Sequence, residues 1–159
     1  MGWRGVAFIV KPAEAIAEFD DFSRQVRAFE KIHAGQASEI FSVNLHTRVE
    51  VLQVDDFALP VSINDGEPGN AWVCSPRTTY ADYAAEEATR YFASWLSFPI
   101  RIVFVVLGFV MAFFRIDKVV AINNWLLSTN IYPALVDVPV HALVESAVKR
   151  WPDHALCFR

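Results

Sequence analysis

One uninterrupted apolar segment dominates this chain: Ile102 to Phe114, with the sequence IVFVVLGFVMAFF. A helix that crosses a bilayer needs about 20 apolar residues, and this run supplies about two thirds of that length. Extending the segment back to Phe92 gives the length but brings in Arg101 and the neighbouring Pro99. An arginine at the centre of a span costs about 2.5–3.5 kcal/mol, which the surrounding Phe, Val and Leu side chains could offset.

We expect this segment to form a helix in the hydrophobic core, because runs of this shorter length are more often core or interfacial helices than spans. The ordinary soluble patterning of the residues that follow it also favours the core. An interfacial helix on a membrane and a true span remain as alternatives. Of the 159 residues, 54% are hydrophobic, so either the core is large or some apolar surface meets a partner or a membrane.

Charge and cysteine content exclude several classes of function. The formal net charge is −4, with acidic and basic residues mixed along the chain, so we expect no nucleic-acid partner. Cys74 and Cys157 lie far apart among apolar neighbours, which predicts buried, reduced thiols rather than a disulfide scaffold. The apolar stretch from Val6 to Val10 is too short for a secretory signal. We therefore expect a cytoplasmic protein.

The hydrophobic period changes once in the first half of the chain. Apolar residues recur at steps of three and four from Ala13 to Ala34, which predicts an amphipathic helix, and the apolar run Gly5–Val10 could be a strand before it. Apolar and polar residues alternate over 41–51, as in half-buried strands. Residues 57–63 continue as a strand in which a proline indicates an edge or an irregularity, and 71–74 is a further short strand.

The second half predicts two helices, a strand, a helix and a last strand. Helical spacing begins at Ser75–Pro76 and is interrupted at Pro99, before the apolar segment. Residues 118–122 are typical of a buried strand, Asp137 caps the next helix, and 154–158 forms the last strand. A strand, a crossover helix and another strand predict a parallel pair. The fold class is therefore α/β (α+β mixed), with a mixed, partly antiparallel sheet flanked by helices.

The best candidate site is a polar cluster that directly follows the strand 118–122, where open α/β sheets bind their ligands. We predict that it binds a small-molecule substrate, because asparagine amides both donate and accept hydrogen bonds. The predicted residues are Asn123, Asn124, Ser128, Thr129, Asn130 and, from a second cluster, Tyr80. The alternative is structural: asparagine also caps helices and closes turns, and the second cluster could be a helix N-terminus with buried tyrosines.

No complete catalytic or metal-binding motif occurs in the chain. The histidines lack a ligand-spaced partner, and neither a phosphate-binding glycine loop nor a nucleophile elbow is present. We therefore assign no metal and no catalytic residue, and Gly66 and Gly69 are expected to serve a turn.

Two segments resemble the amino-terminal half of bacterial proteins related to GNAT-type acyltransferases. They are CSPRTTYADYAAEE (Cys74–Glu87) and DKVVAINNWLLSTNIYP (Asp117–Pro133), followed by the predicted helix and RWPDHALCFR. The resemblance covers roughly the latter half of the chain, and NNWLLSTNIYP is its most specific element. It implies a mixed sheet flanked by helices, with acyl-CoA as donor and an amine as the common acceptor.

The chain departs from this family at one important point, because the pyrophosphate loop Gln/Arg-x-x-Gly-x-Gly/Ala does not occur in it. The resemblance therefore implies one domain, 1–159, that forms the amino-terminal part of a longer GNAT-like domain. Such a fragment would be acyltransferase-related but inactive alone, with no cofactor in this chain and acyl-CoA bound only with the missing carboxy-terminal half. The alternative function is a membrane-associated or partner-binding module that uses the 95–114 apolar segment, which adds peripheral membrane contact or a homo-oligomer to the expected partners.

Overall fold

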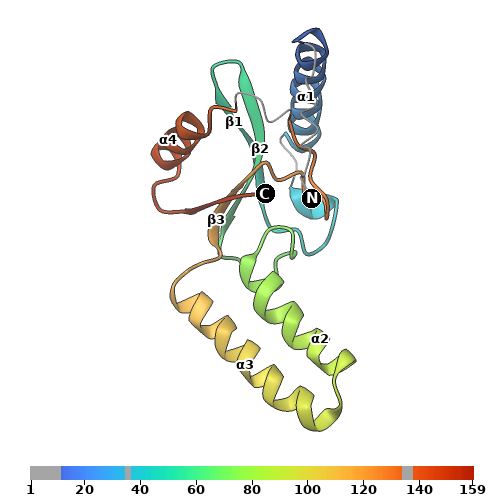
Figure 1. Ribbon diagram of the computed structural model, residues 1–159. Helices are drawn as coiled ribbons and strands as arrows, with labels where there is room; N and C mark the ends of the chain where they lie inside the picture. The colour runs from blue at the N-terminus through green and yellow to red at the C-terminus, as the bar shows by residue number, and fades with distance from the viewer. Residues whose placement is uncertain (1–11, 35–36, 134–137) are drawn as a thin grey trace, which may run out of the picture.

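A four-stranded sheet organises the part of the chain that this computed structural model describes, residues 12–34, 37–133 and 138–159. The strands lie in the order β1 (Arg48–Val54), β2 (Phe57–Asp65), β3 (Lys118–Ile122) and β4 (Ala155–Phe158) (Figure 1). β1, β2 and β3 are antiparallel neighbours, whereas β3 and β4 are parallel. The predicted α/β class with a mixed, partly antiparallel sheet is confirmed, as is the parallel pair.

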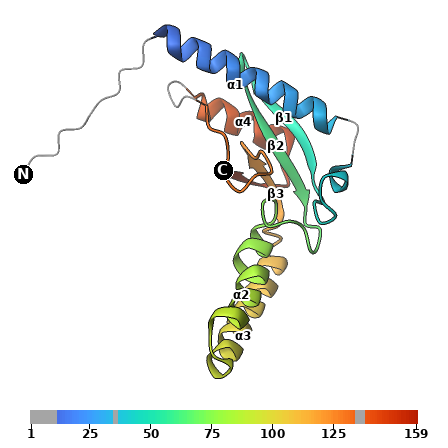
Figure 2. The same ribbon diagram turned by 90° about the vertical axis from the view of Figure 1, so that its right-hand side faces the viewer.

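Two helices pack on one face of this sheet: α1 (Pro12–His33) and α4 (Val140–Arg150), which connects the parallel strands (Figure 2). Every second residue of β2 points to this face, as the period of a strand requires. The buried apolar residues there form one core: Phe22, Val26, Leu52, Phe57, Leu59, Val61, Ile63, Val120, Ile122, Trp125, Leu143, Ala147 and Trp151. Both helices match the predicted ones closely.

Loops, rather than a helix, cover the middle of the opposite face. Ser62 and Asn64 point that way from β2 and are buried, and a small second cluster of Leu45, Ala71 and Cys74 lies over them. The strands predicted at 41–46 and 71–74 are wrong, because both stretches are turns and irregular chain in these loops. The alternation over 41–46 did not reflect burial, since Val43 is 88% exposed.

Pro60 lies in an interior strand, although proline in a sheet is expected at an edge. It is opposite Val51 of β1, and the pairing of β2 with β3 ends one residue further on, at Val61 and Ile122. The Pro60 carbonyl accepts a hydrogen bond of 3.1 Å from the Asn124 backbone N–H. The N and O atoms of a strand residue point to the same side, so the Pro60 nitrogen also faces the chain at the end of β3. Its lack of an N–H therefore removes no hydrogen bond from the pairing of β2 with β3.

A helical hairpin is inserted between β2 and β3 and extends away from the sheet (Figures 1 and 2). A π-helical turn (Thr78–Asp82) leads into α2 (Tyr83–Tyr91), and α3 (Ser94–Phe113) returns along it. The chain reverses at Phe92, whose backbone is extended (φ −111°, ψ 147°). The interruption predicted at Pro99 is wrong, because Pro99 lies inside α3.

The apolar segment 102–114 is helical, but the prediction that it lies in the core is wrong. Within α3 only Gly108 and Met111 are buried, and 11% of its most apolar stretch is buried. The reason is the topology: α1, α4 and the loops already cover the sheet, and α3 packs instead against α2 and the π-helical turn. The predicted strand Gly5–Val10 and the cap Asp137 lie outside the described residues.

Candidate functional site

The predicted polar cluster lies directly after β3, and its central amide is part of the fold. Asn124 is fully buried. Its Nδ2 donates to Ser62 Oγ at 2.7 Å and to the Val73 carbonyl at 2.9 Å, and its Oδ1 accepts from the Leu126 N–H at 3.1 Å. Arg159 also donates to this Oδ1, at 3.2 Å. Asn124 thus ties β2, the 71–74 turn and the chain after β3 together.

The amide of Asn123 is engaged in the same way. Its Nδ2 donates to the Arg159 carbonyl at 3.0 Å, and its Oδ1 accepts from the Trp125 indole N–H at 3.0 Å. Its φ is +61°, a left-handed conformation that asparagine adopts more readily than most residues. A bound substrate amide would have to compete with these internal partners.

The other predicted residues lie in different surroundings. Asn130 accepts from the Trp125 backbone N–H at 3.3 Å, so it belongs with the two buried amides. Ser128 and Thr129 are exposed. Tyr80 is exposed on the π-helical turn and lines a separate pocket of about 300 Å³. The expectation of buried tyrosines in the second cluster is wrong, and the assignment of all these residues to a substrate site stays a prediction.

Two further buried asparagines, missed in the sequence, extend this polar network. Asn64 donates to the Val119 carbonyl at 3.2 Å. Asn70 donates to Asn64 Oδ1 at 3.2 Å and to the His46 carbonyl at 2.6 Å, and it accepts from the His46 N–H at 3.0 Å. The signal for Asn64 was present, because Ser62 and Asn64 continue the period of two in β2 on the face opposite the core. These amides fasten the loops that cover that face.

The turn between these asparagines has the predicted conformation. Gly66 and Gly69 have φ of +97° and +72°, which glycine adopts without the steric cost of a Cβ atom. The predicted role of both glycines in a turn is confirmed.

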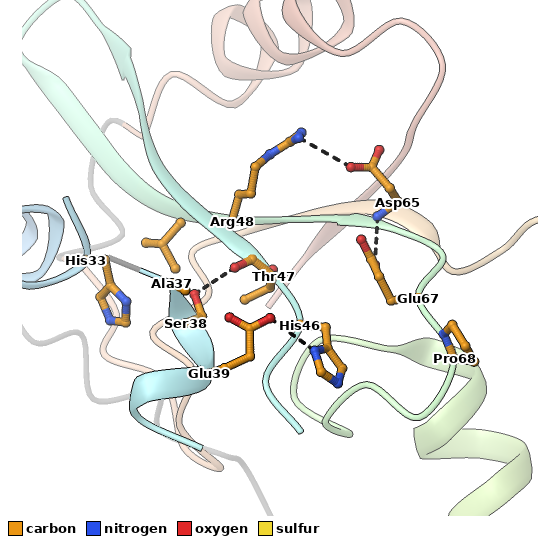
Figure 3. Close-up of a pocket in the computed structure, with 11 residues that line it drawn as sticks. His33, Ala37, Ser38, Glu39, His46, Thr47, Arg48, Asp65, Glu67 and Pro68 are labelled. Carbon is orange, nitrogen blue, oxygen red and sulfur yellow. Dashed lines mark hydrogen bonds and ion pairs between the residues drawn. The ribbon is translucent and has the colours of Figure 1, made fainter. Parts of the chain in front are cut away.

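A charged groove of about 620 Å³ lies beside the start of β1 (Figure 3). Its charged side chains pair with one another: His46 Nδ1 lies 3.1 Å from Glu39 Oε1, and an Arg48 guanidinium nitrogen lies 3.5 Å from Asp65 Oδ2. A hydrogen bond from the backbone, followed by that from His46, lowers the pKa of the Glu39 carboxyl. No group of three or more His, Cys, Asp or Glu side chains arranged to hold a metal occurs among the described residues.

The two cysteines line the same small pocket but differ in exposure. Cys74 is buried, and burial raises the pKa of its thiol to about 11. Cys157 is exposed, so the prediction that both thiols are buried is wrong for it. The cause is its position in β4 at the edge of the sheet, on the face opposite the core that packs under α4.

Among the described residues, α3 carries more exposed large apolar side chains than any other element, on its outer side. We define the α3 surface as the exposed apolar side chains of α3 and of the residue that caps its C-terminus: Trp95, Phe98, Ile102, Val103, Val105, Val106, Leu107, Phe109, Val110, Phe113 and Phe114. At about 100° per residue these positions cover roughly 200° of the helix circumference. The surface is therefore convex and apolar along the whole helix.

The inner side of α3 packs closely against α2 through small residues. Ala81, Ala85 and Ala88 are buried between the helices. A Cβ atom added at Gly108 would lie 3.4 Å from the Ala81 Cβ, so the helices approach about as closely as alanine and glycine allow.

The outer side of α2 is charged, in contrast to the α3 surface. Arg90 pairs with Glu86 at 2.8 Å and with Glu87 at 3.1 Å, and the first of these is the favourable i, i+4 arrangement. The hairpin thus has one apolar side and one charged side.

By length and composition α3 could cross a membrane. Comparisons of the chain with protein-family models, curated proteins and solved structures find no match. The resemblance to GNAT-type acyltransferases therefore stays a prediction, and the candidate function depends on the surfaces of the molecule itself.

Proposed function

We propose that this chain is a membrane-associated α/β domain that binds a lipid surface through the α3 surface. One observation carries the proposal: the most apolar helix of the described residues is 11% buried over its most apolar stretch, while a complete core exists without it. Soluble monomers rarely expose contiguous apolar patches larger than a few hundred Å², and larger ones mark sites of protein or membrane contact.

The shape of the α3 surface favours lipid over a protein partner. A helix that packs on another protein element typically buries an apolar stripe about 100° wide, whereas the exposed apolar residues of α3 extend over roughly twice that arc. A helix that is apolar over such an arc suits an apolar medium, which adapts to a convex surface. A protein partner would need a deep groove that encloses most of the helix.

Flotation with lipid vesicles tests the proposal directly. The chain should float with vesicles, and Phe109→Asp should abolish most of the binding because it places a charge within the α3 surface. Val43→Asp is the matched control: Val43 is 88% exposed but lies in a loop outside the hairpin, so binding should persist. The proposal is overturned if the chain stays monomeric without detergent and does not float. Stable oligomers that fail to bind vesicles would assign the α3 surface to a second copy instead.

A second candidate is a domain related to GNAT-type acyltransferases, and the parallel β3–α4–β4 unit in a mixed sheet is the observation in its favour. This candidate predicts that the chain alone does not bind acyl-CoA, because residues 123–139, between β3 and α4, contain no glycine and a pyrophosphate loop needs close backbone approach. Calorimetric titration with acetyl-CoA tests this. Saturable binding would contradict this candidate's prediction that the chain alone lacks an acyl-CoA site.

A further inference from the structure

We propose that α3 lies flat in one leaflet of an anionic membrane, with Arg101 at the lipid phosphates, and does not cross the bilayer. This inference rests on the proposed membrane association and specifies its geometry and its lipid. It follows from the pairing of the strands on either side of the hairpin, from the charges of α2 and from the charges of α3.

The strand pairing excludes a single crossing while the sheet is intact. β2 precedes the hairpin and β3 follows it, and the two strands pair over five residues, from Val61–Ile122 to Asp65–Lys118. If α3 alone crossed the bilayer, these strands would lie on opposite sides of the membrane. All backbone hydrogen bonds between them would then be lost, and the core on β2 and β3 would be divided.

Insertion of the whole hairpin, tip first, would keep the sheet on one side but would bury charge. Asp82, Glu86, Glu87 and Arg90 would all enter the hydrocarbon, and each charge costs about 2.5–3.5 kcal/mol near the bilayer centre. A flat α3 avoids this cost, because the charged side of α2 faces away from the α3 surface and stays in water. The tip residues Tyr91 and Trp95, which are 77% and 78% exposed, are of the kinds enriched at the interface between lipid and water.

The charge pattern of α3 specifies an anionic lipid surface. Between Ser94 and Ile116 the charged residues are Arg101 and Arg115, with no acidic residue, and both arginines are exposed. At about 100° per residue Arg101 projects to the flank of the apolar arc, where a long side chain can reach the headgroups while its helix lies in the interface. Of the acidic residues of the hairpin, Glu86 and Glu87 are on the charged side of α2, and Asp82, in the π-helical turn, pairs with Arg77 at 3.5 Å.

Vesicles of two compositions test the charge part of the inference. We expect tighter binding to vesicles that contain phosphatidylglycerol than to phosphatidylcholine alone. An arginine near an anionic surface contributes about fivefold in affinity, so Arg101→Ala should reduce binding to anionic vesicles by about fivefold. Arg90→Ala, on the charged side of α2, is the matched control and should change binding little. Equal binding to both compositions would overturn the role of Arg101.

Labels of known position test the orientation. In a Cys157→Ser background, bimane is attached at Phe109→Cys on the α3 surface or at Glu86→Cys on α2, and quenchers are placed at different depths in the lipid. We expect shallow quenching in the acyl region for the label at 109 and none for the label at 86. Deep quenching of both labels would overturn the flat orientation while leaving membrane binding intact. An absence of vesicle binding in every composition would overturn the proposed function as well.

Discussion

The two most apolar segments of the described chain, α3 and β3, have opposite surroundings. β3 is buried at four of its five positions, between β2 and β4 and under the core helices. α3 is longer and at least as apolar, yet nearly all of it is exposed. An apolar composition therefore says that a segment will leave water, but it does not say whether the protein's own core will receive it.

Backbone hydrogen bonding explains why these two segments differ. A strand has unpaired N–H and C=O groups along both edges, so an apolar strand is stable only inside a sheet. A helix satisfies its backbone groups within itself, so an apolar helix needs neighbours only for its side chains. Lipid can supply that contact as well as protein can. The sheet thus fixes β3 in the protein, whereas α3 remains available to a membrane.

Truncation of one core and one surface side chain gives the largest contrast. Leu143→Ala removes a fully buried side chain of α4 that packs in the core and should lower the free energy of unfolding by about 2–5 kcal/mol. Val106→Ala on the α3 surface, where Val106 is 53% exposed, should change it by less than about 0.5 kcal/mol. Urea denaturation without lipid measures both. Equal losses would mean that α3 is packed in a core.

Removal of the buried Asn124 amide should have the next largest effect. Asn124→Ala leaves Ser62 Oγ and the Leu126 N–H without this partner, which should cost about 1–3 kcal/mol. Ser128→Ala, at an exposed position of the same cluster, should leave stability nearly unchanged. Thermal unfolding compares the two variants. If Asn124→Ala kept full stability but lost binding of a small molecule, the predicted substrate site would be correct and the structural role wrong.

Thiol labelling separates a buried from an exposed position on one face of the sheet. Only the thiolate reacts with disulfide reagents, and at pH 8 the Cys74 thiol, with its pKa of about 11, is almost entirely protonated as well as buried. We expect one rapidly reacting thiol in the native chain and two after denaturation, with Cys157→Ser removing the rapid one. Rapid reaction of both native thiols would show that the loops over β2 open readily.

The smallest expected effect is a dependence of stability on pH through His33. Burial lowers the pKa of His33 from its usual 6.5, so below pH 6.5 the unfolded chain takes up the proton before the folded one. Stability from this residue is therefore present above pH 6.5 and is lost as the pH falls towards the lowered pKa. His33→Phe, which keeps an aromatic ring next to Phe29 and Phe41, should reduce the slope of stability between pH 7 and 5. An unchanged slope would contradict the assignment.

Most of the fold could be predicted because periodicity reports burial directly where an element has one buried side. The spacing in α1 and the apolar run of β3 both did so. The alternation over 41–46 failed because loop residues can alternate by chance, and Val43 points to solvent. The predicted break between the two helices, at Pro99, was wrong because Pro99 lies inside α3. The chain reverses instead at Phe92, where no glycine or proline marks a turn in the sequence.

The sites were harder to predict than the fold. The sequence placed Asn123 and Asn124 correctly at the end of a strand, but it could not show that their amides are occupied by partners as distant as Ser62 and Arg159. For α3 the sequence identified an unusual segment and left its environment open among core, interface and span. That choice depends on whether the sheet already has a complete cover, which is a property of the tertiary structure.

Hydrogen exchange with and without anionic vesicles tests the contrast between α3 and β3 most directly. Amide protection follows the local free energy of opening. We predict that β3 amides exchange slowly in both conditions, and that α3 amides exchange much faster than those of β3 in buffer but become protected when vesicles are added. Protection of α3 equal to that of β3 in lipid-free, monomeric protein, or no change in α3 on adding vesicles, would contradict the account.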